Sequence, residues 1–125
     1  MPLKSPVNAA IASPFSTGGG GTRFEWLVAA SYLVNLLRGE GARGLPAIGT
    51  VVEIRLQQAA QGYPVDDVVI VATRGTRQSK LALQVKHALN FTANPLFCEV
   101  MGACWRHYTA STFDRQRDYV GIAIG

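Results

Sequence analysis

The stretch VDDVVIVATRGTRQSKLALQVK, residues 65–86, decides the expected fold. Residues 65–72 form a nearly continuous apolar run entered through two aspartates, which is typical of a central strand. In residues 80–86, apolar side chains alternate with polar or small ones, which is the period of a half-buried strand. The turn-rich residues 73–79 join the two runs. We therefore predict an antiparallel hairpin, in which the start of the first strand lies beside the end of the second.

This hairpin brings together side chains of complementary chemistry. Asp66 and Asp67 open the first strand, and Gln84 and Lys86 close the second. Because side chains alternate across a strand, Gln84 and Lys86 share one face. We expect carboxylate, amide and ammonium groups at one end of the sheet.

The remaining segments complete an α/β fold with a central mixed sheet flanked by helices. The predicted order is helix, strand, strand, strand, helix, strand. Besides the hairpin, the predicted elements are a helix over 22–37, a strand over 50–57, a helix over 95–112 and a strand over 117–125. Thr22 and Glu25 fit a capping box at the start of the first helix. That helix is apolar on nearly every side, so we expect it to be buried on most sides, with Trp26 and Tyr32 in the core.

Chain length and net charge indicate a single, basic domain. The chain has 125 residues, enough for one domain, with a net charge of +4 that is compatible with a polyanionic partner. We expect residues 1–21 to be a flexible leader and 22–125 a domain of a longer protein. The glycine run at 18–21 lacks the GK[ST] ending of a P-loop.

The cysteines and the apolar segments indicate the compartment. Cys98 and Cys104 are the only cysteines, and no Cys/His cluster suggests zinc. No signal peptide or apolar run long enough to span a membrane is visible. We expect a reducing cytoplasm, with no membrane partner.

The acids, the amide and the lysine suit phosphodiester hydrolysis. Mg²⁺ prefers oxygen ligands, often one or two carboxylates with water and phosphate. Such a cation lowers the pKa of bound water, and a neighbouring lysine stabilises the charged transition state. Gln84 offers an oxygen without charge, so the site needs another acid, and Glu25 is the available candidate.

These residues carry a resemblance to a known group of enzymes. The ordered set E…DD…QxK resembles the PD-(D/E)xK nuclease superfamily in its Mrr-like QxK version. The segments GGGGTRFEW, YPVDDVVIV and LALQVKHAL are similar to the double-stranded-DNA nuclease domain at the N-terminus of bacterial antiphage effectors. Those effectors include CD-NTase-associated nucleases of CBASS systems and Avs-type STAND NTPases. The resemblance covers roughly residues 18–125.

The resemblance implies a role for each candidate residue. It implies a restriction-endonuclease-like αβββαβ core, with Lys86 as the catalytic lysine and Gln84 at the position of the second acid. Asp66 or Asp67 is then the metal aspartate, with Asp67 favoured because it lies one step further into the strand, and Glu25 is the acid on the helix. The implied cofactor is Mg²⁺, with Mn²⁺ as a substitute. The implied function is endonuclease activity on double-stranded DNA in antiphage defence, in the cytoplasm of a prokaryote.

The partners follow from the same resemblance. We expect double-stranded DNA as substrate and a homo-oligomer formed through a C-terminal sensor or NTPase region that is not in this chain. We assign DNA contacts to four basic residues: Arg23, Arg74, Arg77 and Arg106.

Each residue also has a structural alternative. Glu25 can simply close the capping box, the aspartates can be turn residues, and Lys86 can extend from the wet face of an edge strand. Two functional alternatives also stay open. One is a catalytically silent domain of the same fold that binds nucleic acid or assembles partners. The other is a nuclease acting on RNA or single-stranded DNA.

Overall fold

The computed structural model describes the backbone of residues 19–125 and the side chains of residues 23–125. The predicted leader therefore lies largely outside the described residues. The helices are α2 (Gly19–Arg38) and α3 (Pro95–Thr109), with short 3-10 helices η1 (Pro46–Ile48) and η2 (Gln58–Gln61). The strands are β1 (Thr50–Leu56), β2 (Val68–Arg74), β3 (Arg77–Lys86) and β4 (Tyr119–Ile124). This order confirms the α/β prediction.

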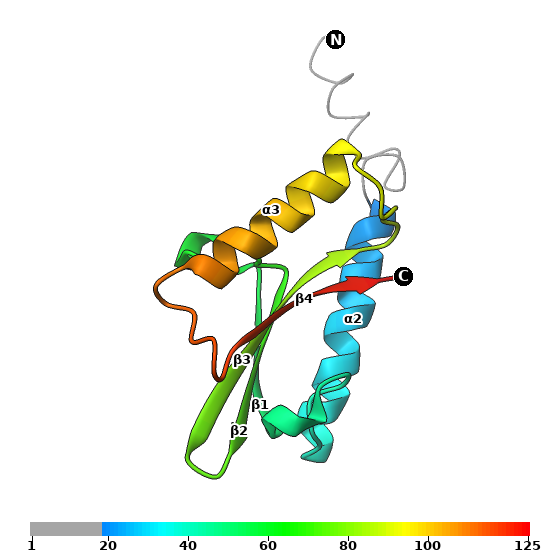
Figure 1. The fold of residues 1–125 in the computed structure, drawn as a ribbon. Helices are drawn as coiled ribbons and strands as arrows, with labels where there is room; N and C mark the ends of the chain where they lie inside the picture. Colours follow the sequence, from blue (N-terminus) through cyan, green and yellow to red (C-terminus); the bar gives the residue numbers. More distant parts are fainter. Residues whose placement is uncertain (1–18) are drawn as a thin grey trace, which may run out of the picture.

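The four strands form one mixed sheet in the order β1-β2-β3-β4 (Figure 1). Strand β1 is antiparallel to β2, and β2 is antiparallel to β3, whereas β4 is parallel to β3. The predicted hairpin is confirmed, because Arg74 pairs with Arg77 across a turn at Gly75 and Thr76. β3 is an interior strand, so the alternative that placed Lys86 on an edge strand is wrong.

One helix covers each face of the sheet (Figure 1). Val68, Ile70 and Leu83 are buried on the face that packs against α2. Val69 and Ala82 are buried on the opposite face, with Ala103 of α3. This two-sided burial explains why β2 is continuously apolar from Val68 to Ala72 rather than alternating.

The N-terminus of α2 differs from the prediction. The helix begins at Gly19, so Thr22 lies inside it and cannot be its N-cap. The predicted capping box is therefore wrong, and Glu25 is available for another role. Glycine is among the least favourable residues in a helix interior, so the run at 19–21 does not indicate that the helix begins there.

The outer face of α2 is a second departure. Tyr32 is buried as predicted, but Trp26 is 67% exposed, so its predicted place in the core is wrong. α2 thus has one apolar face in the core and another facing solvent. None of the helices within residues 19–125 is long and apolar enough to cross a membrane.

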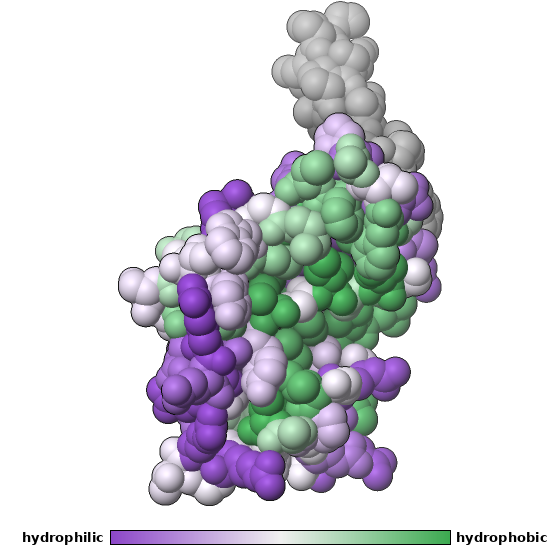
Figure 2. Space-filling view, in the orientation of Figure 1, coloured by the Kyte–Doolittle hydropathy of each residue, from purple (hydrophilic) through white to green (hydrophobic). Residues whose placement is uncertain are grey.

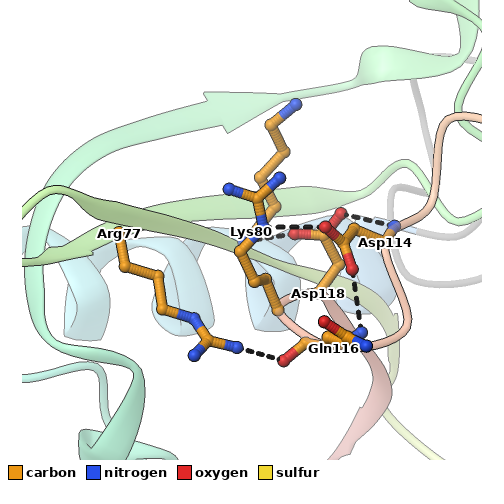
Figure 3. A network of polar contacts seen from close by, with 6 residues as sticks. Arg77, Lys80, Asp114, Gln116 and Asp118 are labelled. Atoms are coloured by element: carbon orange, nitrogen blue, oxygen red, sulfur yellow. Dashed lines mark hydrogen bonds and ion pairs between the residues drawn. The ribbon is translucent and has the colours of Figure 1, made fainter.

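A polar network shapes the loop that leads from α3 to β4 (Figure 3). The carboxylate of Asp118 accepts hydrogen bonds from the backbone N–H groups of Lys80 and Asp114, both at 3.0 Å. Asp114 in turn accepts from the backbone of Gln116 at 2.9 Å and from Arg117 at 2.8 Å. These bonds hold the loop against β3 and set the start of β4.

Candidate functional site

Asp67 is fixed to the end of β3. It directly precedes Val68, which pairs with Leu83, so the antiparallel register places Asp67 beside Gln84. The backbone N–H of Val85 donates to Asp67 Oδ2 at 2.8 Å. One oxygen of a partly buried carboxylate is therefore anchored to the strand that carries the predicted glutamine and lysine.

Gln84 and Lys86 lie on the same side of β3, as predicted. Both are half-buried, whereas the alternating residues Leu83 and Val85 are buried in the core on the α2 side. β4 pairs with β3 along this stretch, opposite Gln84 and Lys86. A long cationic side chain and an amide therefore emerge from the interior of the sheet, near its end.

Glu25 reaches the same region from α2 through a residue that the sequence did not indicate. The side-chain amide of Gln57 donates a hydrogen bond to Glu25 Oε1. The backbone N–H of Gln57 donates to the carbonyl oxygen of Asp67 at 3.2 Å. Gln57 therefore links the two predicted acids. Its φ of +53° is the only positive φ of a non-glycine residue in the described chain, and such strained positions concentrate at functional sites.

No sequence pattern singles out Gln57. It follows β1 as one of two adjacent glutamines, and its left-handed backbone has no marker such as glycine or asparagine. Its only signal was its place at the end of the predicted strand 50–57, at the edge of the sheet where the aspartates begin β2.

Four charged side chains lie close enough to influence one another: Glu25, Asp66, Asp67 and Lys86. Burial raises the pKa of Glu25, and the negative charges of Asp67 and Asp66 raise it further, against the opposing effects of Lys86 and the Gln57 hydrogen bond. Burial also raises the pKa of Asp67, and Asp66 adds to the rise, whereas the Val85 N–H and Lys86 lower it. Crowded, desolvated carboxylates of this kind are stabilised by a nearby cation.

The structure distinguishes the two aspartates. The backbone carbonyl of Asp66 accepts from Gln58 N–H at 2.9 Å, but its side chain forms no hydrogen bond with any described residue. The carboxylate of Asp67 is the one bonded to β3. This difference supports the preference for Asp67 over Asp66 as the candidate metal ligand.

The oxygen atoms gathered here are the smallest set that could bind a divalent cation. Among the residues whose side chains are described, no group of three or more His, Cys, Asp or Glu side chains lies close enough to hold a metal ion. Asp67 Oδ1 forms no hydrogen bond with a described residue, and Gln84 beside it offers a carbonyl oxygen. One or two carboxylates with neutral oxygens and water are a known arrangement for Mg²⁺.

The four predicted DNA-binding arginines are dispersed. Arg23 is exposed on α2, near Glu25, and Arg106 is exposed on α3. Arg74 and Arg77 close the hairpin at the other end of β2, about 20 Å away for a seven-residue strand. There Arg74 donates to the carbonyl of Ala47 at 3.1 Å, and Arg77 donates to that of Gln116 (Figure 3). Arg74 and Arg77 therefore lie apart from the acids and hold neighbouring loops.

His107 is a second residue whose role the sequence did not reveal. It is buried in α3, and its Nδ1 accepts a hydrogen bond from the backbone N–H of Val65 at 3.2 Å. Val65 lies two residues before Asp67, so His107 fixes the segment that leads into the site. His87, which follows Lys86, packs edge-on against Phe24, with ring centroids 5.5 Å apart.

Comparisons of the chain with protein-family models, with curated proteins and with solved structures found no match.

Proposed function

We propose that this protein is a metal-dependent endonuclease that hydrolyses phosphodiester bonds of double-stranded DNA. The observation that carries the proposal is the anchoring of Asp67 to β3 beside Gln84 and Lys86, with Glu25 linked to the same end of the sheet through Gln57. The raised pKa values of Glu25 and Asp67 support it, because a site prepared for a cation concentrates negative charge at partly buried oxygens. The resemblance to the QxK nucleases supports the same chemistry.

Each side chain has a role in this proposal. Asp67 and Gln84 would hold Mg²⁺, with Glu25 or Asp66 as a further oxygen donor. When bound there, the cation would lower the pKa of a coordinated water and neutralise charge on the phosphate. Lys86 orients the attacking oxygen and stabilises the charge that develops on the phosphate oxygens. Val85 N–H and Gln57 keep the carboxylates of Asp67 and Glu25 in position.

The biological setting in this proposal follows the resemblance. The chain would serve as the nuclease of a bacterial antiphage effector in the cytoplasm, and a C-terminal sensor or NTPase region would bring copies together. RNA and single-stranded DNA are the alternative substrates.

A specific observation favours a second candidate, a silent domain that binds nucleic acid or assembles partners. Glu25 Oε1 is already bonded to Gln57, and Asp67 Oδ2 to Val85 N–H. A carboxylate with one oxygen engaged has less capacity for a metal. If these bonds serve only the fold, the acids stabilise a loop rather than bind a cation.

Cleavage of supercoiled plasmid distinguishes the two candidates. The protein is incubated with Mg²⁺, with Mn²⁺ or with EDTA, together with Lys86→Ala and the matched control Lys80→Ala. Lys80 lies on the same strand, and its partner in β2 is Val71, away from the acids. We expect metal-dependent cleavage that falls by at least about 100-fold in Lys86→Ala and stays nearly unchanged in Lys80→Ala.

Two outcomes would redirect the proposal. Undiminished cleavage by Lys86→Ala would remove the lysine from the mechanism. Binding of a labelled duplex without cleavage, in both metals, would favour the silent domain. Parallel reactions with single-stranded DNA and RNA identify the preferred substrate.

A further inference from the structure

Two arginines lie opposite one another at the hairpin end of the sheet, where β2 passes into β3. Arg74 ends β2, Arg77 begins β3, and the two are direct partners in the antiparallel register. Cross-strand partners carry their side chains on the same face of a sheet, and like charges placed directly opposite destabilise the pair. Neither guanidinium forms an ion pair with an acid among the described residues. The hairpin therefore holds a positive pair that a bound anion would stabilise.

A third guanidinium reaches the same place from the loop between α3 and β4, at Arg117. All three arginines line one pocket of about 170 Å³, together with Ser79, Gln116 and Tyr119. Figure 2 shows hydrophilic side chains gathered over this loop and over the hairpin end of the sheet. None of the described residues that line the pocket is acidic. The pocket is therefore positively charged.

Ser79 adds a buried hydroxyl group to this pocket. The residue is only 3% exposed, and its hydroxyl forms no hydrogen bond with any described residue. Every fully enclosed side-chain oxygen or nitrogen among the described residues has a hydrogen-bond partner. The Ser79 hydroxyl, which has none, is therefore not enclosed and opens toward the pocket that the residue lines. A hydroxyl can donate a hydrogen bond, so this one can bind an anion that enters between the arginines.

Each guanidinium is oriented by one contact that uses only part of its hydrogen-bonding capacity. Arg74 and Arg77 each donate to a backbone carbonyl oxygen of a neighbouring segment, and Figure 3 shows the contact of Arg77. Arg117 Nε donates to the carboxylate of Asp114 at 2.8 Å. A guanidinium has about five N–H donors in a fixed plane, so most of them remain for a ligand. The three groups are thus held in place before any ligand binds.

The charge at the pocket indicates the class of anion. Asp114 offsets one of the three positive charges, and it stays ionised because hydrogen bonds from the backbone of Gln116 and from Arg117 lower its pKa. About two positive charges therefore remain. A phosphate monoester carries about −1.5 to −2 charges at pH 7, and arginine matches its oxygen atoms with pairs of N–H donors. A carboxylate or a phosphodiester carries a single negative charge and leaves part of this positive charge unmatched.

We propose that this pocket binds a phosphate monoester group, with the three guanidinium groups around its oxygen atoms and the Ser79 hydroxyl donating to one of them. The pocket is small beside the roughly 300–1,000 Å³ of pockets for drug-sized ligands, so the phosphate enters and the rest of the ligand extends outward. The inference does not rest on the proposed nuclease activity, because the pocket lies at the opposite end of β2 from Asp67.

An NMR titration of the full chain with inorganic phosphate, at constant ionic strength, tests the pocket. We expect saturable shifts of the Nε–Hε signals of Arg74, Arg77 and Arg117 and of the backbone amide signal of Ser79. Sodium nitrate supplies a planar ion of single charge as the control ligand and should cause no saturable shift. A phosphate titration without saturation at these signals, or equal shifts with nitrate, would overturn the proposal.

Substitutions test the assignment of the side chains. Arg117→Gln and Ser79→Ala should each weaken phosphate binding by about tenfold or more, because each removes a hydrogen bond to a charged group. The matched control is Arg115→Gln, in the same loop, where the guanidinium lies 4.5 Å from the centre of the Tyr108 ring and does not line the pocket. The control should keep the dissociation constant to within about twofold, because a charge outside the pocket is screened.

A second measurement covers the case of a variant that folds poorly. Phosphate should raise the melting temperature of the wild type and of Arg115→Gln, because a ligand that binds only the folded state stabilises it. It should raise that of Ser79→Ala much less. Circular dichroism verifies the fold of each variant. Equal losses of binding in Arg115→Gln and Arg117→Gln would show a diffuse effect of net charge and would overturn the site.

Two ligands distinguish the source of the phosphate group. Adenosine 5′-monophosphate represents a free nucleotide, and a short single-stranded DNA with a 5′-phosphate represents the end of a strand. Both are titrated in EDTA to prevent cleavage, and the tighter ligand identifies the source. The same DNA without its 5′-phosphate should bind at least about tenfold more weakly. Equal binding of the two DNAs would contradict a site for a monoester and would favour contacts with internal phosphates.

Discussion

The carboxylate of Glu25 on α2 accepts a hydrogen bond from the side-chain amide of Gln57, 32 residues later in the chain. The backbone of Gln57 also bonds to the carbonyl oxygen of Asp67. Gln57, whose backbone is left-handed, therefore ties α2 to Asp67, the residue that directly precedes β2.

Replacing Gln57 by glycine should raise the pKa of Glu25 further. Glycine tolerates the φ of +53° without strain but removes the amide whose hydrogen bond lowers this pKa. The measurement is an NMR titration of the Glu25 side-chain carboxyl carbon. Gln58→Ala is the control, because Gln58 donates instead to the carbonyl of Leu56. An unchanged Glu25 titration in Gln57→Gly would mean that the bond does not form in solution.

Asp67→Asn should stabilise the protein at neutral pH, whereas Asp67→Ala should destabilise it. Burial raises the pKa of Asp67 in the folded state, so the folded state binds more protons than the unfolded state between the ordinary and the raised value. Stability therefore falls as pH rises through that window, and the ionised group destabilises the fold above it. Asparagine removes the charge and keeps an acceptor for Val85 N–H, for an expected gain of up to about 1 kcal/mol.

Alanine removes that acceptor as well. The unpaired Val85 N–H should then cost about 1–3 kcal/mol. Chemical denaturation of both variants at pH 7 and near pH 3.5 provides the comparison. The gain in Asp67→Asn should shrink at the lower pH, where the wild-type carboxyl is largely protonated. A gain of equal size at both pH values would show that charge is not its cause.

His107→Asn should make the free energy of unfolding less sensitive to pH in the acidic range. Burial lowers the pKa of His107 below 6.5, and Asp118 opposes this shift only in part. Below pH 6.5 the unfolded state therefore binds more protons than the folded state, and stability is lost as pH falls toward the lowered value. Protonated Nδ1 could not accept from Val65 N–H.

Asparagine places an amide oxygen near the position of Nδ1, but its side chain does not ionise. It should be less stable than the wild type at pH 8, because a buried ring is lost, and the difference should narrow by pH 5. Denaturation with urea at both values gives the two free energies of unfolding. A difference that is constant with pH would contradict a neutral, buried His107.

Gly49→Ala should destabilise the fold by more than about 3 kcal/mol. Gly49 precedes β1 with φ of +112°, and an added Cβ would lie 2.1 Å from the carbonyl oxygen of Thr73 in β2. Gly44→Ala separates this clash from backbone strain alone. Gly44 has φ of +81° and open space around it, so its substitution should cost only about 1–2 kcal/mol. Similar losses at both positions in thermal denaturation would show that β2 yields to the methyl group.

The hairpin was predictable because its signals are local. The aspartates, the apolar run and the alternation through Leu83 and Val85 specify two strands and the side on which Lys86 lies, and the turn at Gly75 joins them antiparallel. The start of α2 at Gly19 was not predictable, because glycine disfavours a helix interior and its run there predicts a loop. The exposed side of Trp26 was hidden for a related reason, since a helix that is apolar all round does not reveal which face meets the sheet.

The sequence by itself determined the order of helices and strands, the antiparallel hairpin and the placement of Asp67, Gln84 and Lys86 at one end of the sheet. Period and register are sufficient for these features, because they depend on neighbours along the chain. Only the tertiary structure decided that Gln57 holds Glu25, that His107 holds Val65 and that side chains such as Trp26 are exposed on α2 among the described residues. These contacts join residues distant in sequence, and no periodic pattern encodes which polar groups meet when the helices pack on the sheet.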